Sequence, residues 1–217
     1  MSARIEVLSA HPRDAARHIS RALPMTGPVV ITGGTTAREV YQHLDPREWD
    51  NLDVFFSDER RVPPDDDASN YRMATEAFLG RSKADVRRME GELAPSEGAA
   101  RYNDLVAPLV TDTYELMLLG MGADCHICAM FPGSPALIAD ANCIAVDRPD
   151  GLEGLTLTPA VILSARKIFV PVAGTGKAEA VKRAVVGTET VESCPARLLA
   201  AHPDVTFLLD EAAASLL

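Results

Sequence analysis

The chain has 217 residues, of which 47% are hydrophobic and 24% charged, an ordinary composition for one globular domain. Its formal net charge of −10 argues against nucleic acid or an anionic membrane as a partner, because both are bound through clusters of Lys and Arg. The N-terminus carries Arg4 and Glu6 and no long apolar run, so neither a signal peptide nor a membrane span is expected. This favours a cytoplasmic location. The four cysteines are too few and too irregularly spaced for a disulfide framework, which favours reduced thiols.

Apolar runs with the length of strands alternate with helical patterns along the whole chain. The expected elements are, in chain order, helix 14–23, strand 29–32, helix 36–44, strand 52–57, helices 70–79 and 96–110, strands 114–119 and 143–146, a short strand and helix within 156–164, strand 167–172, helix 176–185, strand 205–209 and a last helix from Glu211. This alternation is typical of the α/β class, with a mostly parallel, Rossmann-like sheet covered by helices on both faces. Because no repeat or linker interrupts it, residues 1–217 are expected to form a single-domain, three-layer α/β/α sandwich.

The most informative segment joins the apolar run 114–119 to a glycine-rich loop that carries Asp124 and His126. Ligands of open α/β sheets bind beyond the carboxyl ends of the strands, so both side chains are expected where chemistry is usually done. The alternative interpretation is a tight turn with a solvated Asp and a packed His.

Two further strands end in loops of similar character. Strand 29–32 leads into two glycines and two threonines at 33–36, just before a helix, and this combination favours an anion such as phosphate. Strand 52–57 leads into Asp58, Glu59 and Arg60. The two acids could form a helix cap or an ion pair with the arginine, but their position at the end of a strand favours a functional role.

Together these segments resemble the family of 6-phosphogluconolactonases, which are relatives of the glucosamine-6-phosphate isomerases. The matching segments are Gly33-Gly34-Thr35-Thr36, Ser57-Asp58-Glu59-Arg60, Val62-Pro63-Pro64, Ser69-Asn70-Tyr71-Arg72, Gly120-Met121-Gly122-Ala123-Asp124 with His126, Phe131-Pro132-Gly133-Ser134, Thr156-Leu157-Thr158, Gly174 with Lys177, Pro195-Ala196-Arg197-Leu198-Leu199 and Asp210-Glu211-Ala212. They cover nearly the whole chain in the family's order. The double proline and the Ser-Asn-Tyr-Arg segment are similar to the lactonase branch.

The resemblance implies hydrolysis of 6-phosphogluconolactone to 6-phosphogluconate, a step of the pentose phosphate pathway that needs no cofactor. His126 would be the general base toward water, because the unperturbed pKa of imidazole lies near neutral pH. Asp124 or Asp58 would orient the imidazole or stabilise its charged form, and backbone N–H groups of the glycine loops would bind the oxyanion. The residues expected to bind the substrate and its phosphate are Gly33, Gly34, Thr35, Thr36, Glu59, Arg60 and Lys177. Arg61 is expected to add positive charge beside them.

The chain departs from the family's pattern in two places. Where the family reads Asp-Gly-His-Thr-Ala-Ser, Cys125 replaces the glycine, while Ile127 and Ala129 replace the two hydroxyl residues. Cys125 therefore either takes an ordinary conformation in a reshaped loop or stores strain beside His126. The second departure is the absence of the family's Arg just ahead of Thr156, where the chain has Glu153 instead, which removes a candidate phosphate clamp.

Two alternative functions remain open, whereas two alternative binding sites do not fit the sequence. A sugar-phosphate isomerase would use the same loops with Asp58 as the base, and a non-catalytic sugar-phosphate-binding protein would explain the altered loop. A dinucleotide site fails because Cys125 stands at the third glycine, and the cysteine spacing matches no usual zinc site. The expected partner is thus a small sugar-phosphate substrate, bound without a metal. The chain is expected to be a monomer or a weak homodimer. The remaining histidines are expected at the surface: His11, His18, His43 and His202.

Overall fold

The computed structural model describes residues 3–217, and its centre is a parallel sheet of seven strands. In spatial order the strands are β1 (Arg4–Val7), β10 (Val205–Leu209), β9 (Ala165–Val172), β6 (Tyr114–Leu118), β2 (Gly27–Ile31), β3 (Leu52–Phe56) and β5 (Asp85–Arg87). Each neighbouring pair is parallel. The middle strands are apolar runs without alternation and are almost fully buried, as in sheets whose two faces are both covered.

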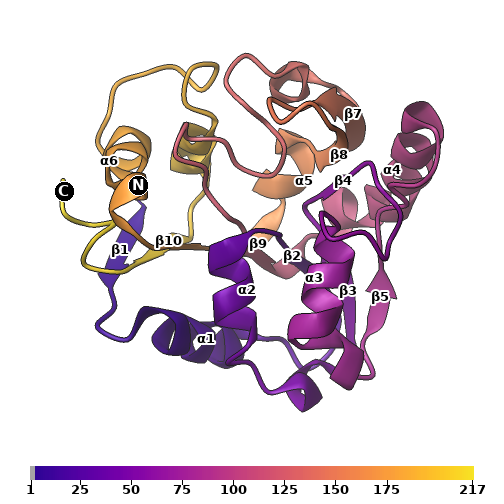
Figure 1. Cartoon of the computed structure of the whole chain (residues 1–217), viewed down its shortest axis with the longest axis horizontal. Coiled ribbons are helices and arrows are strands. Elements are labelled where there is room, and N and C mark those ends of the chain that lie inside the picture. The colour runs from indigo at the N-terminus through magenta and orange to yellow at the C-terminus, as the bar shows by residue number, and fades with distance from the viewer. Residues whose placement is uncertain (1–2) are drawn as a thin grey trace.

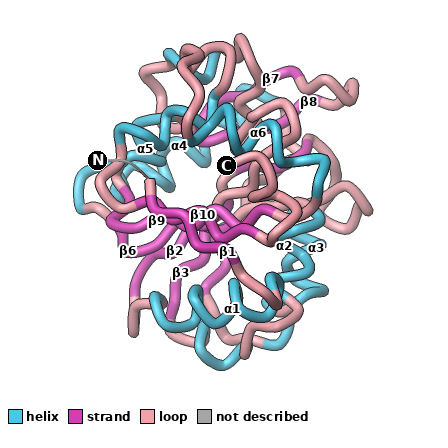
Figure 2. The backbone as a smooth tube through the Cα atoms, turned by 90° about the vertical axis from the view of Figure 1, so that its left-hand side faces the viewer, coloured by secondary structure: helices cyan, strands magenta, loops and turns pink. Residues whose placement is uncertain are grey.

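Helices cover both faces of this sheet (Figures 1 and 2). One face packs against α1 (His11–Ala22), α2 (Thr35–Tyr41) and α3 (Asn70–Ala77), and the other lies under α4 (Pro95–Asp112), α5 (Pro159–Leu163) and α6 (Ala178–Val185). Short 3-10 helices are η1 (Pro46–Trp49), η2 (Leu79–Arg81), η3 (Pro135–Ile138), η4 (Thr175–Lys177) and η5 (Pro195–Ala201). The expected three-layer α/β fold is confirmed.

A second, smaller sheet lies on the same side as α4 to α6 (Figure 1). It is antiparallel, with β8 (Glu153–Leu157) between β4 (Asp58–Arg60) and β7 (Cys143–Asp147). Since β4 follows β3 after one residue, the chain passes directly from the large sheet into the small one. The strand expected at 143–146 therefore exists, but it belongs to this second sheet.

The strand order places a topological switch point between β2 and β6. These strands are neighbours, with Val29 opposite Leu116, yet the chain continues from β2 to β3 on one side and from β6 to β9 on the other. The loops that follow β2 and β6 therefore separate and leave a crevice beyond the carboxyl edge of the sheet, where open α/β sheets bind ligands.

The structure corrects several expectations. Residues 211–216 form turns instead of the expected last helix. The strands β1, β4 and β5 were not predicted, because they are three or four residues long and charged. His11 and His202 are buried, and their Nε2 atoms lie 2.9 and 2.6 Å from the carbonyl oxygens of Leu208 and Ala165. The polar residues next to both histidines in the sequence give no indication of such a bond.

Candidate active site

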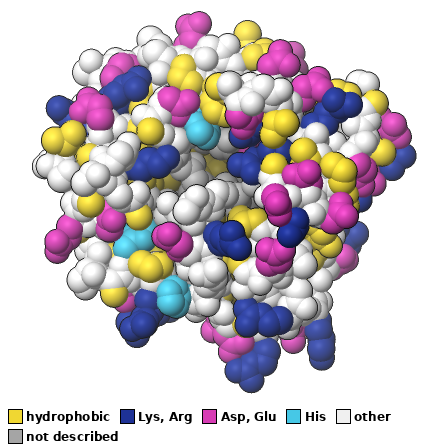
Figure 3. All heavy atoms as spheres, viewed as in Figure 1, with side chains coloured by type: hydrophobic (Ala, Val, Ile, Leu, Met, Phe, Trp, Pro, Cys, Tyr) yellow, Lys and Arg dark blue, Asp and Glu magenta, His cyan; other side chains and the backbone are white. Residues whose placement is uncertain are grey.

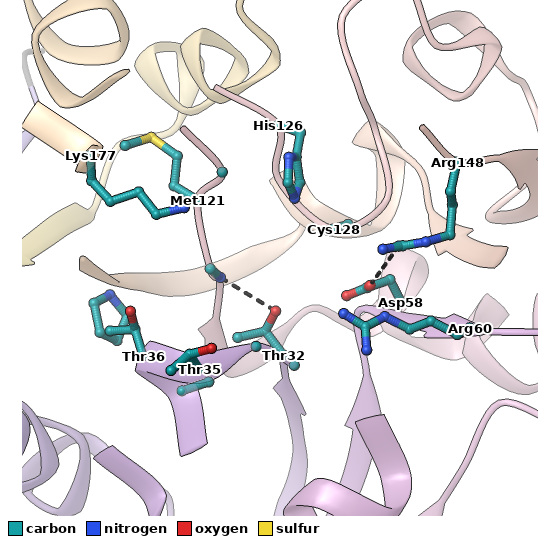
Figure 4. Close-up of a pocket in the computed structure, with 16 residues that line it drawn as sticks. Thr32, Thr35, Thr36, Asp58, Arg60, Met121, His126, Cys128, Arg148 and Lys177 are labelled. Atoms are coloured by element: carbon teal, nitrogen blue, oxygen red, sulfur yellow. Dashed lines mark hydrogen bonds and ion pairs between the residues drawn. The ribbon is translucent and has the colours of Figure 1, made fainter. Parts of the chain in front are cut away.

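The crevice at the switch point contains a pocket of about 200 Å³ (Figure 4). This volume is below the range of pockets for drug-sized ligands and suits a small polar metabolite. Of the residues expected to act on or bind substrate, those that line it are Gly33, Gly34, Thr35, Thr36, Asp58, Arg60, His126 and Lys177. On the surface, this face is hollowed near its centre, with Lys or Arg side chains and a histidine around the hollow (Figure 3).

Close contacts fix the loops after β2 and β6 against each other and against α3. The N–H of Gly120 donates to Oγ1 of Thr32 over 3.3 Å. A Cβ on Gly33 would lie 1.8 Å from Oδ1 of Asn70, and Gly34 has a φ of +99°. The glycines are therefore required both by space and by backbone conformation, which explains why the pattern 33–36 was informative.

His126 and Asp124 form a hydrogen-bonded dyad. Nδ1 of His126 lies 2.6 Å from Oδ1 of Asp124, and this bond lowers the pKa of the carboxyl group to about 2. The carboxylate is therefore ionised at neutral pH and holds the proton of the neutral imidazole on Nδ1, which leaves Nε2 as the basic nitrogen. The side chain of His126 is 30% exposed, while Asp124 stands behind it outside the pocket lining.

Asp58 lies in the wall of the pocket at the start of β4, two residues after β3 ends, with its side chain 7% exposed. Its Oδ1 accepts from the hydroxyl of Ser57 over 2.8 Å, and its Oδ2 accepts from Nδ2 of Asn70 over 3.3 Å. Nη1 of Arg148 lies 4.0 Å from Oδ2. These neighbours compensate the cost of burying the carboxylate.

The cationic side chains stand at opposite ends of the pocket. Figure 4 shows Lys177 on the same side as Thr35 and Thr36, whereas Arg60 lies beside Asp58. Burial lowers the pKa of Lys177, although the charge of Asp124 opposes this shift. Arg60 is held by a 2.6 Å bond from its Nη1 to the carbonyl of Ala68. The side chains that could donate to a phosphate are therefore divided between two ends, with Thr35, Thr36 and Lys177 at one and Arg60 at the other.

Glu59 lies outside the pocket lining, contrary to the expectation that it binds substrate. Its carboxylate is buried at the start of α3, where it accepts from the N–H groups of Asn70 and Tyr71 at 2.7 and 2.8 Å. Burial raises its pKa, and these N–H bonds oppose the rise. Glu59 is thus the helix cap that the sequence left open as an alternative. Arg61 likewise points away from the pocket and pairs with Glu153.

Comparisons with known proteins show the family of this chain. The sequence profile of the family "Glucosamine-6-phosphate isomerases/6-phosphogluconolactonase" matches residues 6–208. The chain belongs to this family. It is 31% identical over 199 residues to a 6-phosphogluconolactonase of Synechocystis sp., covering 86% of this chain and 83% of the relative.

Solved structures of the family share the fold over nearly the whole chain. The 6-phosphogluconolactonase of Trypanosoma cruzi superposes with a TM-score of 0.85 and 25% identity, covering 100% of this chain and 98% of its own. A monomeric glucosamine-6-phosphate deaminase gives a TM-score of 0.85 at 23% identity, covering 99% of this chain and 100% of its own, and shows the fold alone. Both of these structures therefore share the architecture of this chain.

The family's glycine is replaced by Cys125, which adopts the left-handed conformation with a φ of +73°. Of the two expected outcomes, Cys125 therefore shows the strained one, at a cost of about 1–2 kcal/mol that glycine would avoid. The thiol is fully buried and faces the carbonyl of Ala180 at 3.6 Å, on the side of the loop away from the pocket. Burial raises its pKa to about 12, so it is neutral and a weak nucleophile at neutral pH.

We expect Cys125→Gly to leave kcat/KM for the lactone within about threefold of the wild-type value, because glycine adopts this conformation freely and the thiol does not face the ligand. The measurement is steady-state hydrolysis by both proteins. A gain of tenfold or more would instead show that the cysteine restricts the substrate.

Arg148 lines the pocket and was not predicted. It lies in the turn after β7, within the polar, turn-like segment 147–151, which contains no sequence signal for a buried charge. Its side chain is nevertheless only 8% exposed.

Residues 3–217 contain neither a cluster of metal-binding side chains nor a helix that could span a membrane. In this part of the chain, no group of three or more His, Cys, Asp or Glu side chains is arranged to hold a metal ion. Nor does any helix described there combine the length and the hydropathy needed to cross a membrane.

Proposed function

We propose that the chain hydrolyses 6-phosphogluconolactone to 6-phosphogluconate. The observation that carries the proposal is the dyad of His126 and Asp124, joined over 2.6 Å at the edge of a small pocket with cations at both ends. A lactone hydrolase needs a base for water and donors for an anionic substrate, and this pocket holds both.

In this mechanism, Nε2 of His126 removes a proton from water as the oxygen attacks the lactone carbonyl carbon. The carbonyl becomes a tetrahedral oxyanion, which collapses and breaks the bond from the carbonyl carbon to the ring oxygen. The imidazolium returns its proton to that ring oxygen, so the base is regenerated. Asp124 remains ionised throughout, keeps the ring oriented and stabilises the imidazolium.

The phosphate of the substrate is assigned to the end of the pocket that holds Lys177, Thr35 and Thr36. The ammonium supplies a point charge, and the two hydroxyls and the N–H groups beside Gly34 supply donors. The other end, with Asp58 and Arg60, is then left for the lactone ring. Figure 4 shows His126 between these two ends, on the side from which it can face the lactone ring.

The second candidate is a sugar-phosphate isomerase that uses Asp58 as its base. It is favoured by the position of this carboxylate in the pocket wall. However, both oxygens of Asp58 already accept hydrogen bonds, from Ser57 and Asn70, whereas Nε2 of His126 is left for a water molecule. The geometry therefore supports hydrolysis better.

The test is turnover of freshly prepared 6-phosphogluconolactone, followed by proton release and corrected for spontaneous opening of the lactone. Glucosamine 6-phosphate is assayed in parallel for isomerisation. Hydrolysis at enzymatic rates without isomerisation supports the proposal, and the opposite result overturns it. The predicted monomer or weak homodimer and the cytoplasmic location stay predictions, and sedimentation tests the first of these.

A further inference from the structure

Arg148 brings a guanidinium into the pocket from the turn between β7 and β8. The turn is closed by the N–H of Arg148, which donates to the carbonyl of Leu152 over 2.9 Å. From there the side chain reaches back along β8, and Figure 4 shows its guanidinium beside Asp58 and Arg60. A charged group that is 8% exposed needs compensating contacts, which the surroundings supply.

The side chain of Arg148 passes over Gly154, and the absence of a Cβ there makes room for it. An ideal Cβ on Gly154 would lie 3.1 Å from Cδ and 3.6 Å from Cγ of Arg148. Gly154 is also the second residue before Thr156, in the segment where the sequence lacks the expected arginine. The position in β8 that lacks a side chain is thus the position over which the arginine of the neighbouring turn passes.

Asp150 fixes the guanidinium so that only one of its nitrogens is left for the pocket. Its Oδ2 accepts from Nη2 over 2.9 Å and from Nε over 3.2 Å. Nη1 lies 4.0 Å from Oδ2 of Asp58, which is longer than a hydrogen bond, so its N–H groups are available. Arg148 therefore offers a single donating nitrogen instead of a two-nitrogen fork.

Phe131 connects this nitrogen to the catalytic dyad. Its ring centroid lies 4.4 Å from that of His126 and 5.4 Å from the Cζ atom of Arg148. The aromatic ring thus packs against both the proposed base and the arginine. His126 and Arg148 also line the same pocket, so one small substrate can contact both.

The end of the pocket that holds Asp58, Arg60 and Arg148 has a net charge that suits an oxygen that becomes negative only during the reaction. Arg60 and Arg148 are offset by the carboxylates of Asp58 and Asp150, so the formal sum is close to zero. A phosphate dianion would meet the buried Asp58 here, whereas the Lys177 end carries a cation with hydroxyls. A near-neutral donor set instead favours a carbonyl oxygen that becomes an oxyanion.

We propose that Nη1 of Arg148 binds the carbonyl oxygen of the lactone and the carboxylate of the product, so that Arg148 recognises the oxidised end of the ligand and not its phosphate. The inference rests on the proposed function. Asp150 and Gly154 are positioning residues, since the first holds the guanidinium and the second leaves space for the side chain.

The test compares two ligands that differ only at this end. 6-Phosphogluconate carries a carboxylate where glucitol 6-phosphate carries a hydroxymethyl group. Titration calorimetry of Arg148→Ala should show about 10–100-fold weaker binding of 6-phosphogluconate, the range of a charged hydrogen bond, and glucitol 6-phosphate binding within about threefold of wild type. Lys177→Ala should weaken both ligands alike. Arg61→Ala is the matched control, because this arginine directly follows β4, pairs with Glu153 outside the pocket and should change neither affinity.

Gly154→Ala keeps Arg148 but displaces its side chain, so it should reproduce the selective loss for 6-phosphogluconate. The added Cβ also approaches the carbonyl of Glu59 at 3.0 Å, and Asp150→Asn therefore serves as a second positioning variant without that contact. Equal losses for both ligands in Arg148→Ala, or no loss for either, overturn the inference even when the wild-type protein hydrolyses the lactone. A selective loss without any lactone turnover by the wild type overturns the proposed hydrolysis and leaves carboxylate recognition standing.

Discussion

Replacing His126 by Asn should lower kcat for 6-phosphogluconolactone by about 10²–10⁴-fold, the usual contribution of a general base, with little change in KM. The asparagine keeps a polar group beside Asp124 but supplies no basic nitrogen to take the proton of water. Because Lys177 and the hydroxyls of Thr35 and Thr36 are untouched, binding of the phosphate should persist. The measurement is the initial rate of proton release at saturating substrate, after subtraction of spontaneous opening.

The matched control is His43→Asn, which makes the same substitution at an exposed histidine just after α2. It should leave both kcat and KM unchanged. Turnover of His126→Asn within about threefold of the control would remove His126 as the base and would direct attention to Asp58, whose carboxylate lines the pocket.

The parts of the site that follow strand ends could be predicted from the sequence. Parallel strands such as 114–119 are continuous apolar runs, and they fix where the loops with Asp124, His126 and Gly33 must meet. Asp58 is found in the same way, because the apolar run 52–57 ends beside it. Local pattern suffices here, since the residues that form the strand and those of the candidate site are adjacent in sequence.

The remaining parts depend on contacts between distant segments. Glu59 follows a strand end as Asp58 does, yet it caps α3 because the N–H groups of Asn70 and Tyr71 come to it. Arg148 enters the pocket only because β7 and β8 form a hairpin beside β4, and β4 was too short and charged to be expected. The role of Gly154 cannot be predicted from the sequence, because it depends on the Arg148 side chain that passes over it.

The position of the His126 ring depends on Gly122, which has no side chain. An ideal Cβ on Gly122 would lie 2.0 Å from Nδ1 of His126 and 2.4 Å from Oδ1 of Asp124. Both distances are far below van der Waals contact, so one member of the dyad has to move when a methyl group is present. The N–H of Gly122 also donates to the carbonyl of His126 over 2.9 Å, which holds the loop closed around the added atom.

Gly122→Ala should therefore lower kcat by about 10²-fold or more, because misplacement of a base by about 1 Å is enough for such a loss. Gly176→Ala is the control, since a Cβ there meets nothing within 4 Å. The mechanism of the loss is tested by combining Gly122→Ala with His126→Asn. If alanine acts by displacing the dyad, the double variant should be no slower than His126→Asn alone, since changes within one catalytic unit are not additive. A further fall in the double variant, with thermal unfolding close to that of the single variants, would show that Gly122 acts on the reaction by a route other than the position of the dyad.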